Sequence, residues 1–357
     1  MHRQSEQQRF VDLWVGPGRS RSDRFFEAVN QSVDWHEIES ALAKVYSSPR
    51  GRPSHPPILL FKTLLIQRWY DLSDPAAEDC LNDRKSFARF VGLSLDEKAP
   101  DHSTISRFRA KLIAECLMAP LIERLMRQIE AKGLVLKQGT IMDASLIHSA
   151  AHPPASPRPR KAPPQAAASP AAGDDGVPPR AAAPDTQVAD ETADPYTSGK
   201  LSKIDPDARW ARKGKAAWFG YKIHIAIDDE RRIVRAHKVT AANVNDCVIG
   251  PSLVQPDGGA HYADKGYSSK PMRQALAQHG LADGVMQLPG KHYPLRPAER
   301  RRNRVLTKIR SAVEGVFGEF KRNFGFRRAR YIGLPKVQFE CDLAVIAFNI
   351  KTMALAT

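Results

Sequence analysis

Three acidic residues stand in sequence settings that suit metal-dependent chemistry. Asp143 interrupts the apolar run 141–147, Asp264 closes the short apolar run 260–263, and Glu314 lies within a basic stretch. A carboxylate inside an apolar strand is destabilising unless a partner compensates its charge, and a divalent cation is one such partner. Carboxylate oxygens are hard ligands that suit Mg²⁺ or Mn²⁺, and two such ions can hold both oxygens of a phosphodiester displacement. In a strongly basic chain, this arrangement indicates chemistry on DNA.

The charge of the chain supports a polyanionic partner. Its 357 residues carry a formal charge of +15, with a sequence pI of about 9.7, which favours nucleic acid first and an anionic membrane surface second. The hydrophobic fraction is 42%, and no apolar run approaches the roughly 20 residues of a membrane span. The segment Met1–Glu6 has no apolar stretch after its charges, so we expect no signal peptide.

Cysteines and histidines give little support for a zinc site. The four cysteines are scattered and form no CxxC pair, which argues against a disulfide scaffold and fits a reducing cytoplasm. Four histidines show no joint metal-ligand spacing, so we expect structural or phosphate-contacting roles for them. They are His102, His148, His224 and His261.

Positive charge is concentrated near the C-terminal end. The range 291–330 contains 13 Lys or Arg against three Glu, and aromatic residues are interleaved with them. Such clustering is typical of a nucleic-acid contact surface rather than of average solvated surface.

The first 130 residues are predicted to form an all-helical, helix-turn-helix-like domain. Apolar residues recur at helical spacing in 59–70 and 76–91. A further helix over 101–112 has Asp101 or Ser103 as N-cap. Three basic residues lie off its apolar stripe and are expected to contact DNA, the alternative being a packing bundle with ordinary surface charge. They are Arg107, Arg109 and Lys111.

Residues 131–357 are predicted to form an α/β domain with a mixed sheet. Strands are expected at 139–147, 221–228, 233–240, 259–263 and 284–288, with a helix over 269–279 and a later long helix that includes 310–321. The stretch 151–190 contains 22 Ala or Pro among 40 residues. Because it lacks hydrophobic periodicity, we interpret 151–198 as a disordered or extended linker.

The long basic helix presents a mixed face. Arg310, Glu314, Phe317 and Lys321 share one side of it, since they are spaced by three or four residues or multiples of these. The two cations could keep Glu314 ionised for metal binding and contact phosphates. The alternative is a surface salt bridge between Arg310 and Glu314, which stabilises a helix by only a few tenths of a kcal/mol, about 0.2–0.5.

These segments resemble the bacterial insertion-sequence transposases of the DDE type. The run Arg310-x₃-Glu314-x₆-Lys321 is similar to the signature around their catalytic Glu, although Thr307 stands where the family commonly has Tyr. Segments similar to those that carry the first and second Asp are 141–144 and 263–267.

The N-terminal part resembles the helical domain of the family numbered five among insertion sequences. The similar segments are 51–53, 57–70 and 101–108. All the motifs occur in the family's order, and together they cover most of the chain outside 151–200.

The resemblance implies a ribonuclease H-like fold and a two-step reaction. Asp143, Asp264 and Glu314 would hold two Mg²⁺ ions, which Mn²⁺ could replace, with Arg310 and Lys321 in support. The site would cleave the element's end to leave a 3′-OH and then direct that 3′-OH at target DNA. The resemblance also implies binding of terminal inverted repeats, a homodimer that joins two ends, and a bacterial cytoplasmic enzyme associated with the nucleoid.

Ten basic residues are our candidates for DNA contact. Some flank Trp210, Trp218 and Tyr221, whose rings could stack unpaired bases, with core packing of Trp218 as the alternative. The ten are Arg107, Arg109, Lys111, Lys213, Lys215, Lys222, Arg301, Arg302, Arg304 and Lys308.

Two other functions remain open at this point. One is a site-specific, metal-dependent endonuclease that cuts without joining. The other is a catalytically silent DNA-binding regulator derived from a transposase, against which the presence of all three carboxylates argues.

Overall fold

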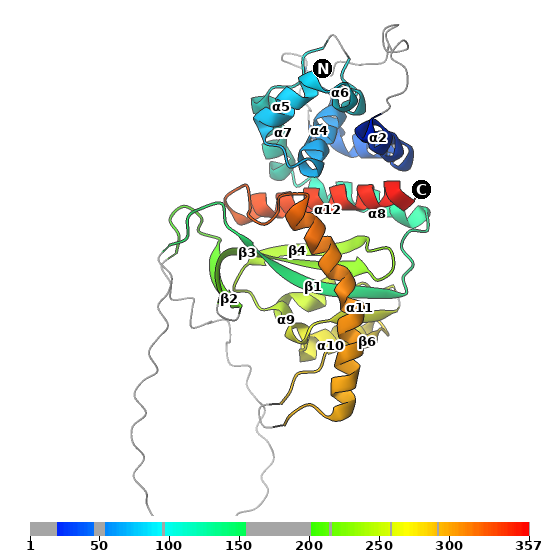
Figure 1. Cartoon of the computed structure of the whole chain (residues 1–357), viewed down its shortest axis with the longest axis vertical. Coiled ribbons are helices and arrows are strands. Elements are labelled where there is room, and N and C mark those ends of the chain that lie inside the picture. Colours follow the sequence, from blue (N-terminus) through cyan, green and yellow to red (C-terminus); the bar gives the residue numbers. More distant parts are fainter. Residues whose placement is uncertain are drawn as a thin grey trace, which may run out of the picture.

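The computed structural model describes residues 20–45, 54–94, 97–154, 201–213, 216–257, 259–290 and 293–356. The helices of the first half form one group, and a mixed sheet lies beside them (Figure 1). The helices of this group are α2 (Arg21–Ser32), α3 (Trp35–Leu42), the short η1 (Ala43–Val45), α4 (Pro57–Trp69), α5 (Asp74–Asp83), α6 (Lys85–Val91), α7 (His102–Ala114) and α8 (Met118–Ala131).

Helix α4 is the centre of the helical group. Pro57 opens it, in the first turn, where an N–H would have no helical acceptor. Its apolar side chains are buried on several sides, against α3, α5, α6 and α7. An α-helix that is apolar all round must be enclosed by others, and this sequence property sets the arrangement of the group.

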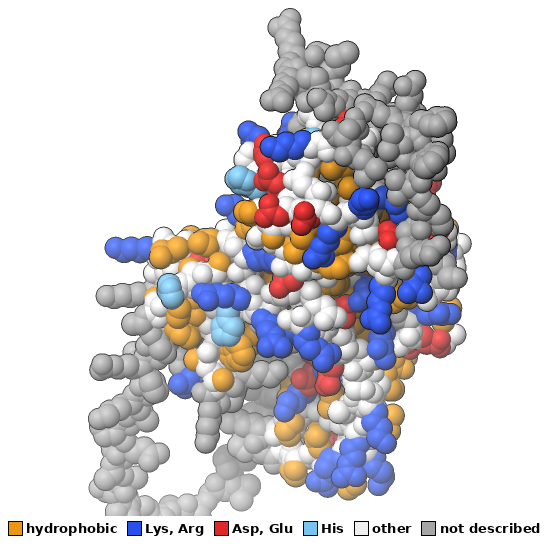
Figure 2. Space-filling model, turned by 45° about the horizontal axis from the view of Figure 1, so that its top comes forward, with side chains coloured by type: hydrophobic (Ala, Val, Ile, Leu, Met, Phe, Trp, Pro, Cys, Tyr) orange, Lys and Arg blue, Asp and Glu red, His pale blue; other side chains and the backbone are white. Residues whose placement is uncertain are grey.

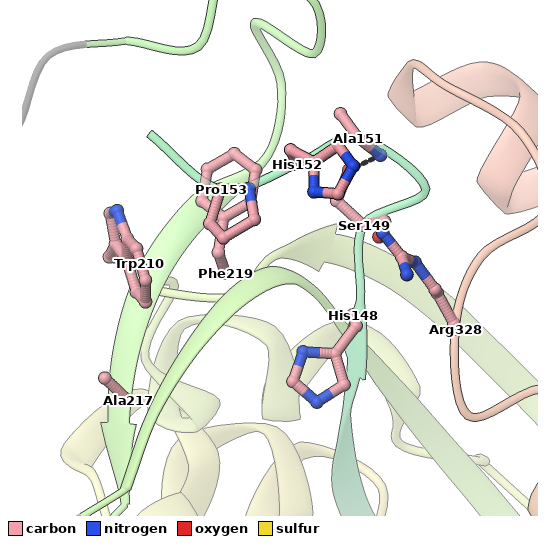
Figure 3. A pocket seen from close by; sticks show the side chains of 9 residues that line it. All are labelled: His148, Ser149, Ala151, His152, Pro153, Trp210, Ala217, Phe219 and Arg328. Carbon is pink, nitrogen blue, oxygen red and sulfur yellow. Dashed lines mark hydrogen bonds between the residues drawn. The ribbon is translucent and has the colours of Figure 1, made fainter. Parts of the chain in front are cut away.

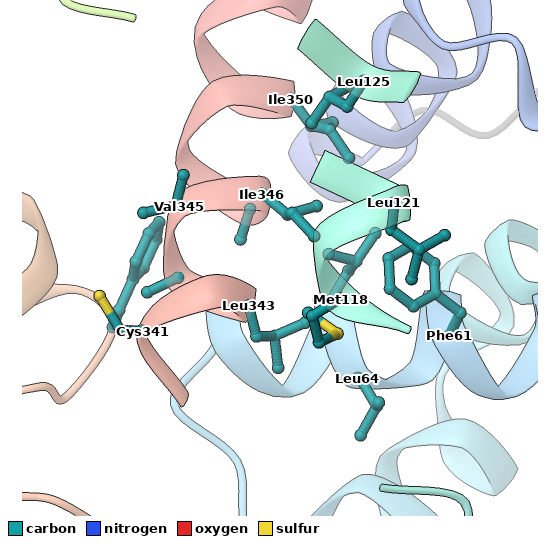
Figure 4. Close-up of a cluster of buried hydrophobic side chains, with 14 of the residues drawn as sticks. Phe61, Leu64, Met118, Leu121, Leu125, Cys341, Leu343, Val345, Ile346 and Ile350 are labelled. Carbon is teal, nitrogen blue, oxygen red and sulfur yellow. The ribbon is translucent and has the colours of Figure 1, made fainter. Parts of the chain in front are cut away.

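The helix α12 (Leu334–Ala356) joins the helical group to the sheet. It contacts α2, α4 and α8 on one side and the strand β4 on the other, and Figure 1 shows it lying between the two layers. Phe61, Met118 and Leu121 pack against its residues Leu343 and Ile346 (Figure 4). Full burial of each such side chain stabilises the fold by about 1.5–3 kcal/mol.

The sheet has six strands in the order β2-β3-β1-β5-β6, with β4 also paired to β3. The pairs β1–β3, β2–β3 and β3–β4 are antiparallel, and the pairs β1–β5 and β5–β6 are parallel. The strands are β1 (Gly139–His148), β2 (Arg209–Lys213), β3 (Ala216–Asp228), β4 (Val234–Ala241), β5 (Ala260–Ala263) and β6 (Ala282–Val285).

Helices cover both faces of this sheet. Ile141 and Ile225 face the large core shared with α11 (Pro297–Arg322) and α12, whereas Met142 and Ala226 face a smaller core on the opposite side. The alternation follows from the two-residue period of a strand. The short elements on the second side are α9 (Asp246–Ile249), η2 (Gly250–Leu253), η3 (Lys265–Tyr267) and α10 (Lys270–Gln278).

The predicted fold class is confirmed. An all-helical N-terminal region precedes a mixed sheet flanked by helices, as in a ribonuclease H-like core. The expected helix over 76–91 is two helices, α5 and α6, because Arg84 adopts an extended conformation between them. The segments β2, α9 and α12 were not among the expected elements.

Several predictions concern residues outside the described part of the chain. They are the segment 51–53, Lys215, the terminus Met1–Glu6 and most of the predicted linker, from 155 to 198. Within the described ranges, no helix is long and apolar enough to cross a membrane.

A buried ion pair ties α4 to α12. Arg68 and Glu340 lie 3.3 Å apart with side chains only 3% and 0% exposed. Arg68 also donates a hydrogen bond to the carbonyl of Phe324, and Glu340 accepts one from the backbone N–H of Arg330. Charged groups this deeply buried are tolerated only when paired and hydrogen-bonded.

This pair gives a stability prediction. Glu340→Ala leaves the Arg68 guanidinium buried without its counter-charge, and we expect the free energy of unfolding to fall by about 3–5 kcal/mol in urea denaturation. The double variant Arg68→Met, Glu340→Leu should recover part of this loss. Glu123→Ala is the control, because Glu123 pairs with Arg127 while 72% exposed, and equal losses in the two alanine variants would contradict the prediction.

Candidate active site

Two of the three predicted carboxylates lie at the same level of neighbouring strands, Asp143 within β1 and Asp264 directly after β5. In the parallel pair of β1 and β5, Met142 lies opposite Ala263. The next residue in each chain segment is Asp143 or Asp264, so the register places the two side by side. Parallel neighbours lie about 4.8 Å apart, which brings both side chains within reach of one cation.

Arg310 of α11 is the cation that both aspartates meet. Its guanidinium lies 2.9 Å from an oxygen of Asp143 and 3.8 Å from an oxygen of Asp264. The arginine side chain is 13% exposed, and its Nε atom is buried without a hydrogen-bond partner among the described residues. Helix α11 packs across β1 and β5, because Val313, Val316 and Phe320 face the sheet.

Glu314 follows Arg310 by one turn on the same side of α11 and is exposed. Within the described part of the chain, the structure defines no hydrogen bond or ion pair of the Glu314 side chain. The described part of the chain also contains no group of three His, Cys, Asp or Glu side chains gathered closely enough to hold a metal ion. The structure therefore brings Asp143 and Asp264 together, and leaves Glu314 apart from them.

The donor set nevertheless suits a divalent cation. Two carboxylates from separate strands converge on a single positive group, the Arg310 guanidinium, and carboxylate oxygens are the ligands that Mg²⁺ and Mn²⁺ prefer. Asp143 and Asp264 could therefore serve as ligands of such a cation, and Glu314 follows Arg310 by one turn on α11.

The first half of α11 carries exposed basic side chains. Arg300, Arg301, Arg304 and Lys308 are exposed, and Figure 2 shows Lys and Arg side chains gathered at the lower end of the molecule. Arg302 has a different role, because its guanidinium donates to the carbonyls of Val285 and Asp283 on β6. These bonds anchor α11 to the sheet edge and favour a structural role for Arg302 over the predicted DNA contact.

Helix α7 begins at the predicted cap, since Asp101 accepts a hydrogen bond from the N–H of Thr104 at 2.6 Å. A hydrogen bond from the hydroxyl of Ser103, together with this bond, lowers the pKa of Asp101 to about 2. Arg107 is exposed, as expected, and Lys111 is half-buried.

Arg109 does not lie on the exposed side of α7. It is 6% exposed, forms an ion pair with Asp74 of α5, and lies over the ring of Tyr331 at 4.9 Å. The prediction that Arg109 contacts DNA is wrong, because the stripe of packing residues is wider than Ile105, Phe108 and Leu112 alone.

Two expectations for residues of β3 are also corrected, namely DNA contact by Lys222 and base stacking by Tyr221. Lys222 is 15% exposed, and its ammonium group is held by Asp246 at 2.9 Å and by the carbonyl of Val244 at 2.6 Å. Tyr221 is fully buried and donates its hydroxyl hydrogen bond to Asp205 at 2.5 Å. Tyr221 is thus enclosed in the core and Lys222 is committed to partners within the protein, and the side chain of Lys213 is outside the described part.

A cavity of about 390 Å³ lies beyond the end of β1 (Figure 3). Trp210 and Phe219 form one side of it and Arg328 lies across from them. Trp218 instead packs against His148 in a tilted arrangement, with ring centroids 4.6 Å apart. Burial, Arg328 and Lys321 lower the pKa of His148, which places Lys321 near this end of β1.

Sequence reasoning did not connect three polar residues with the turn that carries Asp264. They are His224, Asp246 and Tyr267, and the first and last are fully buried. A histidine in the apolar run of β3, and a tyrosine three residues after Asp264, were the available signals. Burial raises the pKa of Tyr267 well above its usual value, and Asp246 and Asp143 add to the effect.

Comparison with known protein families identifies both parts of the chain. Residues 18–111 match a transposase domain (DUF772), and residues 181–350 match a transposase DDE domain. Asp264, Glu314 and Arg310 fall within the second match, whereas Asp143 lies between the two, so its place in the site rests on the register of β1 and β5. No solved structure matches the chain. With these two domains in this order, the chain is a DDE transposase, an enzyme that cleaves and transfers DNA with the help of a divalent metal.

Proposed function

We propose that this transposase binds the terminal inverted repeats of an insertion sequence, cleaves the element's ends and joins the 3′-OH ends to target DNA. The observation that carries the proposal is the meeting of Asp143 and Asp264 on Arg310, in a helix that also carries Glu314 and a basic face. Because two ends of the element must be joined, we propose that the active form is a homodimer.

Asp143, Asp264 and Glu314 would hold two Mg²⁺ ions, with Mn²⁺ as a substitute. Bound divalent ions supply activation of the attacking oxygen and stabilisation of the charge on the phosphate. Arg310 holds the two aspartates toward each other, since like charges at this distance otherwise repel. Lys321, further along the same face of α11, is suited to contact a phosphate of the strand.

Exposed cations lie on the same helix as Arg310. Arg301, Arg304 and Lys308 precede Arg310 on α11 but lie on another side of the helix, so they are suited to bind a DNA backbone beside the carboxylates rather than in line with them. Arg107 lies on the separate helix α7 and is the candidate for reading the terminal repeat. We keep the aromatic cavity near Trp210 as a candidate contact for unpaired bases.

The carboxylate assignment predicts separable cleavage and binding. Asp143→Asn, Asp264→Asn and Glu314→Gln should each reduce cleavage of a terminal-repeat duplex by more than about 100-fold, the upper range for residues that merely support metal ligands. DNA binding measured without metal should survive, because phosphate contacts come from other residues.

Glu319→Gln is the matched control. Glu319 lies on the same helix but pairs with Lys351 at 2.5 Å, so this variant should cleave normally. Full cleavage by Glu314→Gln would remove Glu314 from the site. Cleavage without joining to a second duplex in the wild type would favour the endonuclease, and neither activity would favour the silent regulator.

Substitution of the two arginines of α7 should affect different properties: DNA binding for Arg107 and stability for Arg109. Arg107→Ala should weaken binding to the terminal repeat more than to random DNA, by about 1–3 kcal/mol if Arg107 contacts a base. Arg109→Ala should instead lower the free energy of unfolding, because Asp74 loses its partner. Fluorescence anisotropy with both duplexes measures the binding of Arg107→Ala, and urea denaturation measures the stability of Arg109→Ala. An equal loss of affinity for both DNAs in Arg107→Ala would assign Arg107 to backbone contact.

The salt dependence of DNA binding should show whether the basic side chains of α11 contact phosphates. Each phosphate contact contributes about 0.9 to the slope of log K against log salt concentration, so the triple variant Arg301→Ala, Arg304→Ala, Lys308→Ala should lower that slope by about 2–3. Arg302→Ala should leave the slope unchanged, since Arg302 is bound to β6. An unchanged slope in the triple variant would place the DNA elsewhere.

A further inference from the structure

A chain of polar side chains runs beneath the sheet and ends at the turn that carries Asp264. It lies on the face opposite α11, where Lys222 and His224 of β3 both point because residues two apart in a strand share a face. Asp246 comes from the first turn of α9, and Tyr267 comes from η3. The roles described so far leave these four residues without a function.

The outer end of this chain is an ion pair. Asp246 and Lys222 lie 2.9 Å apart and are 27% and 15% exposed. The same Asp246 oxygen lies 3.9 Å from Nδ1 of His224. The two partly buried charges hold each other in place next to the imidazole of His224.

The hydrogen bonds of His224 determine its tautomer. Thr240 uses its hydroxyl hydrogen on the carbonyl of Ala241, so its oxygen accepts from Nε2–H of His224 at 3.1 Å. Nδ1 of His224 is then an acceptor and faces the hydroxyl of Tyr267 at 3.4 Å. Burial lowers the pKa of His224 to about 4, so the neutral form is the one present near pH 7.

Tyr267 connects this network to the second carboxylate. Its N–H donates to the carbonyl of Asp264 at 3.0 Å, and an Asp264 side-chain oxygen accepts from the N–H of Lys265 at 2.5 Å. The tyrosine ring is fully buried among Met142, Met272 and their neighbours. Holding the ring therefore holds the short turn from which the Asp264 side chain projects.

Two glycines make room for this packing. A Cβ on Gly250 would lie 2.9 Å from the Tyr267 ring, and a Cβ on Gly266 would lie 3.2 Å from Asp246 Oδ2. The ring and the carboxylate approach the backbone so closely that a side chain at either glycine would displace them. The Asp264 turn and the polar network are thus closely packed at both glycines.

We propose that Tyr267, held by His224 and by the Asp246–Lys222 pair, is a positioning residue that fixes Asp264 for metal binding. The inference rests on the proposed function, because it concerns the same carboxylate. Arg310 restrains the aspartates from the α11 side, and this network restrains the backbone of the Asp264 turn from the opposite face. Outer partners of this kind orient ligands, and their loss typically weakens metal affinity about 10–100-fold.

The test measures Mn²⁺ binding to the full chain without DNA, by isothermal titration calorimetry. Asp246→Asn removes the charge that holds Lys222 and borders His224, and Tyr267→Phe removes only the hydroxyl while keeping the ring in the core. We expect the Mn²⁺ dissociation constant to rise about 10–100-fold in Asp246→Asn and to rise less in Tyr267→Phe. Metal-free DNA binding should stay at the wild-type level in both.

Asp342→Asn is the matched control. Asp342 forms a comparable pair with His237, 2.7 Å apart, between α12 and β4. This variant should change the free energy of unfolding without changing the Mn²⁺ dissociation constant. If Asp246→Asn failed to fold, Tyr267→Phe would still decide the question.

The outcomes separate two failures. Wild-type Mn²⁺ binding that persists in Asp264→Asn would overturn the proposed metal site itself. Binding that is lost in Asp264→Asn, but unchanged in Asp246→Asn and Tyr267→Phe, would overturn only the positioning role. An equal rise in Asp342→Asn would also overturn it, because general loosening of the fold would then explain the effect.

Discussion

Helix α12 is apolar on nearly every side, and a helix of this kind requires partners all round. It finds them in the helical group above and in β4 below. The buried pair of Arg68 and Glu340 fixes the contact with α4, since two charges without water accept few other geometries. The placement of the DNA-binding candidates relative to the catalytic sheet depends on this one shared helix.

The geometry of the candidate site depends on charge compensation. Two aspartates at the same level of adjacent strands repel each other, and Arg310 compensates them from a helix packed on the same face. The buried tyrosine and histidine on the opposite face leave little freedom to the turn after β5. The proposed metal-binding pair is thereby built from strand register, with side chains on both faces of the sheet behind it.

Much of this could be read from the sequence, because strand alternation and helical spacing are local properties. The cap at Asp101, the hairpin of β3 and β4, and the sheet with a basic helix all follow from such patterns. Pairings between distant segments could not be read in this way. Arg109 and Lys222 look exposed by spacing, but Asp74 and Asp246, which bury them, lie 35 and 24 residues away.

The order of translation adds a consequence to the position of α12. Every element that it contacts is synthesised before it, so the apolar sides of α2, α4 and α8 remain uncovered while a nascent chain is still on the ribosome. Chains interrupted before residue 334 would expose these surfaces and become substrates for chaperones and proteases. Incomplete products would thus be degraded rather than persist as fragments that lack an intact catalytic domain.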